Sequence, residues 1–288
     1  MNVVIDPNPS KMDTKRKILY TVVIAICVVA ILISVFVVIF SDEGEAKPVK
    51  QPTIISTEEY LQKEAEFEGL FVNKTINQLE QSILIMNKIN KEDDIIGTSY
   101  VSQEKVTGKY SLDVNIPYIN INNATVKEYN NEIQQIFKQK ALDIINDSES
   151  NNIIYTVDYI AYVNEHNILS IAIRSILKES NNAQRTIIQT YNYDFNNNKE
   201  ISLEHILELK GLTKSDVEKK VTQKIQQEQN KVEALKQLGY NIFERNYKDK
   251  MYKVENTTEF FLGKDNFLYL IYAYGNDHFT SELDLVIF

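Results

Sequence analysis

Three histidines, His166, His205 and His278, are the residues best suited to proton transfer or metal binding in this chain. None has a second histidine three to five residues away, so the spacing excludes the helical zinc-binding motif. Ser202 precedes His205 by one helical turn and allows a Ser–His pair, but a serine at the start of a short helix is typical of an N-cap. His166 and His278 fall at predicted turns. The sequence therefore predicts no catalytic residue, no metal site and no cofactor.

Carboxylates are the second group that could do chemistry, and the chain has 40 Asp and Glu residues. Two carboxylates that folding brings together can cleave a glycosidic bond as a general acid with a base or nucleophile. No spacing distinguishes one such pair, so a hydrolase stays an open alternative. Asp194 precedes an asparagine-rich turn, and its side chain is expected to cap that turn.

Tyrosines offer a third possibility, which is ligand binding without catalysis. Tyr155 and Tyr159 alternate on one predicted strand, and Tyr191 and Tyr193 alternate on another. Such rings supply a large contact area and a hydroxyl, so the four residues form a candidate ligand-binding face. The alternative is that the rings pack the sheet and leave only the hydroxyl at the rim.

The composition limits the classes of function. A net charge of -9 argues against nucleic acid as a partner, because phosphate binding needs a basic surface. Only 8 of the 288 residues are glycine, and no phosphate-binding glycine loop is present. The single cysteine, Cys27, lies in an apolar segment, so the remaining chain can form no internal disulfide and has no thiolate nucleophile.

Residues 18–40 carry no charge and are long enough, as a helix, to cross a hydrocarbon core of about 30 Å. Basic residues precede the segment and acidic residues follow it, which predicts a cytoplasmic tail at 1–17 and an extracellular C-terminal domain. The expected location is the cell membrane, as a single-pass signal-anchor protein. Cleavage near Ala46 is the alternative, because small residues at 44 and 46 suit a signal peptidase.

The positions of turns and apolar residues predict the elements that follow. Residues 41–57 read as a linker, and 58–94 as a helical stalk or packed helix. Blocks of strands and helices then indicate an α+β fold, an antiparallel sheet plus helices behind one N-terminal transmembrane helix. The expected elements are two or three strands ending at Pro117, a helix from Asn122 or Asn123 to 145, strands at 153–163, 168–177 and 185–195, helices at 202–209 and from Thr213 or Ser215 to 239, and strands at 259–262, 267–274 and 282–288.

Two stretches resemble a known extracytoplasmic module. The first runs from Asp113 to Ile145, and the second holds the signature Tyr191, Asn192, Tyr193 and Asp194 followed by Ile201, Ser202 and Leu203. They resemble the module shared by RsiV-type anti-sigma factors and the N-terminal part of PdaC-type peptidoglycan deacetylases. The resemblance covers residues 95–288, with a first part at 95–147 and a second at 151–288.

The resemblance implies an α+β domain of the bacterial envelope that binds a protein or a cell-wall component. The expected function is a membrane-anchored, non-catalytic binding or sensing protein whose ligand is a lysozyme-like protein or peptidoglycan. One alternative is transmembrane signalling of the anti-sigma type. The other is the peptidoglycan-acting hydrolase with a carboxylate site.

Overall fold

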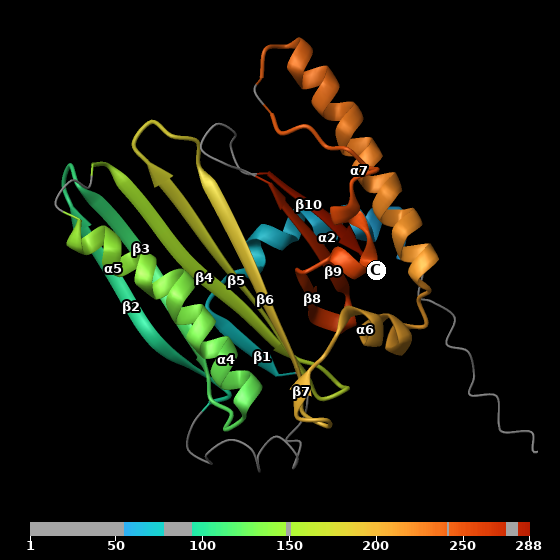
Figure 1. Ribbon diagram of the computed structural model, residues 1–288, viewed down its shortest axis with the longest axis horizontal. Helices are drawn as coiled ribbons and strands as arrows, with labels where there is room; N and C mark the ends of the chain where they lie inside the picture. The colour runs from blue at the N-terminus through green and yellow to red at the C-terminus, as the bar shows by residue number, and fades with distance from the viewer. Residues whose placement is uncertain (1–54, 78–93, 148–150, 241, 275–281) are drawn as a thin grey trace, which may run out of the picture. The chain divides into compact units, whose positions relative to one another are not determined.

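The computed structural model describes residues 55–77, 94–147, 151–240, 242–274 and 282–288, which belong to one compact unit that spans Lys50–Phe288 (Figure 1). The predicted tail, the apolar segment 18–40 and most of the linker lie outside these residues. Within the described part of the chain, none of the helices combines the length and the apolar character needed to cross a bilayer. The membrane anchor therefore stays a prediction.

A seven-stranded mixed sheet is the centre of the fold, with the order β2-β3-β4-β5-β6-β7 and with β1 beside β4. Its strands are β1 (Lys74–Asn77), β2 (Ile96–Val106), β3 (Tyr110–Ile119), β4 (Ile153–Val163), β5 (Ile168–Glu179), β6 (Arg185–Asp194) and β7 (Lys199–Glu200). The predicted meander is confirmed, since β4, β5 and β6 pair antiparallel in sequence order.

The expectation of a purely antiparallel sheet was wrong at one edge of β4. There β3 pairs in parallel along the first half of β4, and β1 pairs in parallel along the second half. The reason lies in the connection between β3 and β4. It is helical and carries the chain back along the sheet, so that the next strand starts in the same direction as the last. The fold is α+β, with both parallel and antiparallel pairs.

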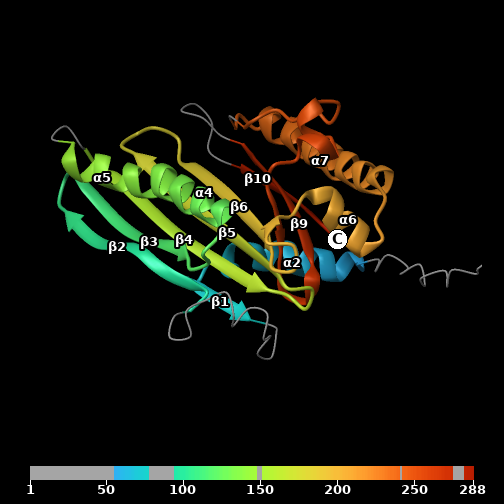
Figure 2. The same ribbon diagram turned by 60° about the horizontal axis from the view of Figure 1, so that its bottom comes forward.

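That helical connection covers one face of the sheet. It consists of α4 (Ala124–Ile133), the π-helical turn η3 (Gln134–Lys138) and α5 (Gln139–Asn146), which lie along the same face (Figure 2). Asn123 caps the start, where its side chain accepts a hydrogen bond from the backbone N–H of Thr125. The Asn130 side chain is buried and bonds both the N–H and the C=O of Ile119 at 2.9 Å, which fixes α4 to the end of β3.

A second, three-stranded sheet lies on the opposite face of the main sheet. Its antiparallel strands are β8 (Phe260–Leu262), β9 (Leu268–Tyr274) and β10 (Glu282–Ile287). One face packs on α6 (Leu203–Lys210) and α7 (Lys214–Gln237). The other face packs against β4, β5, β6 and the N-terminal helix α2 (Thr57–Glu66). The second sheet is thus enclosed between a helical layer and the main sheet.

Three buried polar side chains of the main sheet hold the edge of β8. Thr190 Oγ1 accepts from the Phe260 N–H at 3.1 Å, and Ser170 Oγ accepts from the Leu262 N–H at 2.9 Å. Asn192 donates to the Phe260 carbonyl at 2.9 Å and accepts from Ser170 Oγ at 2.6 Å. Backbone groups at a sheet edge normally require another strand, and here side chains replace it.

The region predicted as a helix over 58–94 differs in the structure. α2 ends at Glu66, a short turn η2 (Phe67–Leu70) follows, and the chain then enters β1. Asn73 adopts a positive φ of 54°, and its side chain accepts from the Tyr159 N–H, which starts the pairing with β4. The buried Phe67 and Phe71 make this a packed segment of the domain. Residues 78–93 lie outside the described residues.

Candidate functional site

The four candidate tyrosines lie on one face of the main sheet, as the alternation predicted, but α4, η3 and α5 cover that face. Tyr155, Tyr159, Tyr191 and Tyr193 are between 1% and 5% exposed. The Tyr155 hydroxyl donates to the Phe137 carbonyl, and the Tyr191 ring packs against the tilted ring of Tyr129 of α4, with their centroids 4.9 Å apart. In this structure they pack the sheet, which was the alternative interpretation, and Tyr191 also lines a hollow at the edge of the sheet.

The remaining signature residues have structural positions. Asn192 is the buried link to β8, and Asp194 Oδ1 accepts from the N–H groups of Asn196 and Asn197, so the predicted turn cap is confirmed. Ser202 accepts from the backbone N–H of His205 and is the N-cap of α6. Ile201 and Leu203, the latter the first residue of α6, are buried in the cluster that α6 and α7 form with the second sheet.

The histidines are not assembled into a site. His205 is exposed, and its ring contacts Glu208 at 3.3 Å in place of the Ser202 hydroxyl. His166 lies in a turn and is partly exposed, while His278 falls outside the described residues. In the ranges that the structure describes, no group of three His, Cys, Asp or Glu side chains is arranged to hold a metal ion.

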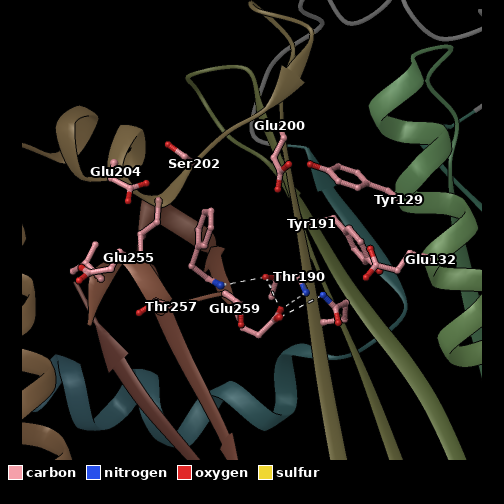
Figure 3. A pocket seen from close by; sticks show the side chains of 15 residues that line it. Tyr129, Glu132, Thr190, Tyr191, Glu200, Ser202, Glu204, Glu255, Thr257 and Glu259 are labelled. Atoms are coloured by element: carbon pink, nitrogen blue, oxygen red, sulfur yellow. Dashed lines mark hydrogen bonds between the residues drawn. The ribbon is translucent and has the colours of Figure 1, made fainter. Parts of the chain in front are cut away.

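A hollow of about 380 Å³ opens along the free edge of β6. The short strand β7 pairs with Tyr193 and Asp194, and among the described residues no strand pairs with the edge of β6 before them. α4 borders the hollow on one side, the start of α6 borders it on another, and the segment before β8 closes it (Figure 3). We call this hollow, lined by Tyr129, Glu132, Tyr191, Glu200, Glu204 and Glu259, the acidic cleft.

Glu259 completes the hydrogen bonding of the free strand edge. Its Oε2 accepts from the Thr190 backbone N–H at 2.6 Å and from Thr190 Oγ1 at 2.9 Å. Burial raises the pKa of the Glu259 carboxyl, the two bonds from Thr190 oppose that rise, and the Glu132 charge adds to it. Glu259 therefore has a structural role at the base of the cleft as well as a place in its lining.

The lining is acidic and has few counter-charges. Glu255 at the rim forms an ion pair with Lys214. Across the described ranges, no lysine or arginine pairs with the other four glutamates, which are Glu132, Glu200, Glu204 and Glu259. Carboxylates that face one cavity without cations create a negative potential there. This potential favours a positively charged occupant.

The two tyrosines of the cleft differ in their hydrogen bonds. Tyr129 donates to the Asn192 carbonyl at 3.2 Å. The Tyr191 hydroxyl is buried beside the Glu132 carboxylate, but it has no partner of hydrogen-bond geometry. Burial raises the pKa of both phenols, and the nearby glutamates raise it further, so both are neutral hydroxyls at neutral pH.

Sequence reasoning did not find the cleft. Its lining comes from segments as distant as α4 and the residues before β8, and no local spacing connects them. The one available signal was the position of Glu200 and Glu204 on either side of Ser202 in the signature. A polar residue next to a predicted turn is too common to mark a site.

Comparisons with known proteins give no assignment of family. No family model matches the chain, and no curated protein matches it. The solved structures that are similar to this chain include a DUF3298 family protein from Pseudomonas aeruginosa PAO1 and a member of the DUF3298 family from Bacteroides fragilis NCTC 9343.

The first has 12% sequence identity and a TM-score of 0.38, over 68% of this chain and 91% of that chain. The second has 15% identity and a TM-score of 0.32, over 67% and 88%. Because both TM-scores lie below 0.5, the similarity identifies neither the family nor the function of this chain.

Proposed function

We propose that this chain is a membrane-anchored binding or sensing protein of the bacterial envelope, with its domain outside the cell, and that it acts without catalysis. The ligand is an envelope protein, such as a lysozyme-like protein, or peptidoglycan. The apolar segment 18–40 and the resemblance of residues 95–288 support the location. The acidic cleft is the single structural observation that carries the binding role.

The structure of the cleft is suited to binding a ligand. Its walls are side chains on a helix, a strand edge and a helix start, each fixed by buried contacts, so the lining is preformed. Its volume of about 380 Å³ lies within the range of small-ligand sites, about 300–1,000 Å³. A ligand group that enters would meet carboxylates, a free phenol and the rings of Tyr129 and Tyr191.

One observation favours a second candidate, a peptidoglycan-acting hydrolase. A buried glutamic acid with a raised pKa beside further carboxylates is the arrangement that glycosidases use. Against this role, Glu259 Oε2 already accepts two hydrogen bonds from Thr190, and Gln189 donates to its other oxygen at 3.4 Å. These bonds favour the ionised acceptor and leave the carboxyl poorly placed to deliver a proton.

The test is retention together with product analysis. The full-length chain in neutral detergent is incubated with purified sacculi and with a panel of lysozyme-type proteins, and bound chain and released glycans are measured in the same samples. We expect specific retention by one of the two ligand classes without new glycan products. New products that disappear in Glu259→Gln would replace the binding function by the hydrolase, and the absence of both retention and new products would refute both functions.

A further inference from the structure

We infer that the acidic cleft binds a primary alkylammonium group, which inserts between Glu132 of α4 and Glu204 of α6 and reaches the Tyr191 hydroxyl. This inference rests on the proposed binding function and specifies the chemistry of the ligand. The group can come from a free amine or from a lysine side chain of a polypeptide. Both present the same charge and the same apolar stem.

Charge is the first reason for this ligand. Glu132, Glu200 and Glu204 line the cleft from three different elements, and within the described residues no lysine or arginine lies within ion-pair distance of any of them. Carboxylates elsewhere on this protein do find partners, as Glu179 does with Lys140 and Glu228 does with Lys224. An entering ammonium group would neutralise a cluster that the chain leaves uncompensated.

The unsatisfied hydroxyl is the second, independent reason. Tyr191 is 4% exposed and is one of the residues that line the cleft, and its buried hydroxyl has no partner of hydrogen-bond geometry. A buried polar atom without a partner costs roughly 1–3 kcal/mol, and native structures contain few of them. In Figure 3, Tyr191 lies between Tyr129 and Glu132 on one wall of the cleft. An ammonium group has three N–H donors and can supply the missing bond to the phenol oxygen.

The arrangement of the carboxylates distinguishes an organic cation from a metal ion. In the part of the chain that the structure describes, no three acidic or imidazole side chains converge on one point, as a metal ion requires. The glutamates are instead distributed around the hollow (Figure 3). Distributed charges with aromatic rings between them suit a cation on an apolar stem, since the rings contact the stem and attract the charge.

The test measures binding of defined probes to the full-length chain in neutral detergent by isothermal titration calorimetry. The probes are 1,5-diaminopentane, its uncharged analogue 1,5-pentanediol, and a terminally blocked trilysine peptide. Two variants are compared with the natural chain. One is the double substitution Glu132→Gln/Glu204→Gln, and the other is Tyr191→Phe, which removes only the hydroxyl. Glu128→Gln is the matched control, because Glu128 is exposed on the same helix one turn before Glu132 and does not line the cleft.

We expect the diamine or the peptide to bind and the diol not to bind. The double glutamate variant should weaken binding at least tenfold, Tyr191→Phe about threefold to tenfold, and Glu128→Gln less than twofold. Binding of the diamine alone points to a free amine, and binding of the peptide to a polypeptide partner. The inference is overturned if neither cation binds, if the diol binds equally, or if Glu128→Gln weakens binding as much as the double variant.

The outcomes separate this inference from the proposed function. Retention by sacculi or a lysozyme-type protein without amine binding would reject the ammonium site and leave the binding function in place. Amine binding without retention by either envelope ligand would establish the site and reject the proposed ligand classes.

Discussion

Replacing Asn192 by alanine should detach the second sheet from the main sheet. Asn192 is 4% exposed and is the only signature residue with side-chain bonds to both layers. Its Nδ2 donates to the Phe260 carbonyl, and its Oδ1 accepts from Ser170, whose oxygen in turn accepts from the Leu262 N–H. The variant removes the first two bonds and releases Ser170 from its fixed orientation.

The expected loss follows from the groups left without a partner. The Phe260 carbonyl and the Ser170 hydroxyl are both buried, and each unsatisfied buried group costs about 1–3 kcal/mol. The free energy of unfolding should therefore fall by about 2–6 kcal/mol. The loss of side-chain volume is small beside this cost, because Asn192 is a short residue.

The assay is urea unfolding of the full-length chain in neutral detergent, followed by circular dichroism. Asn131→Ala is the control, because Asn131 is exposed on α4 and alanine is the better helix former there. Amide hydrogen exchange adds a local readout, since the Leu262 N–H should exchange faster in Asn192→Ala. A loss below about 1 kcal/mol with unchanged exchange at Leu262 would refute the reasoning.

Three further changes test other parts of the structure. Asp284→Asn should lower the free energy of unfolding by about 3–5 kcal/mol, because the buried Arg245 loses the carboxylate to which it donates two hydrogen bonds. A change below about 1 kcal/mol in urea unfolding would contradict this prediction. Ser202→Ala should cost about 1 kcal/mol by removing the cap of α6, whereas Ser202→Asp should retain most of the stability in the same measurement. Burial raises the pKa of Glu259, so the folded state favours its protonated form. The stability that this group contributes is therefore fully present below its ordinary pKa of 4.5, and it is lost as the pH rises through the raised pKa. Glu259→Gln should flatten that decline in unfolding midpoints measured from pH 4 to 7, and an unchanged decline would show that another group causes it.

Local patterns predicted most of the elements correctly. The strands at β4, β5 and β6, the caps Asn123, Ser202 and Thr213, and the turn at Asp194 follow from alternation and side-chain bonds within a few residues. Such signals depend only on neighbours in the sequence, so they can be interpreted without knowledge of the tertiary fold.

Long-range arrangements were the part that the sequence did not determine. Tyr155 and Tyr159 on β4, and Tyr191 and Tyr193 on β6, are spaced as a surface-binding face would be, but a helix from another part of the chain covers them. The four residues of β1 are too few to show a period, and their parallel partner β4 lies far along the chain. The acidic cleft arises for the same reason, since it exists only where α4, the β6 edge and the segment before β8 meet.

The most direct test of the whole account is whether the acidic cleft carries the binding of the envelope ligand. The experiment with sacculi and the lysozyme panel first identifies the ligand class. Retention by that class should then be compared between the double variant Glu132→Gln/Glu204→Gln and the control Glu128→Gln, both as the full-length chain. The account predicts that the double variant loses retention while the control keeps it and neither releases glycan products. Equal retention of both variants would contradict the account, because the ligand would then bind elsewhere on the domain.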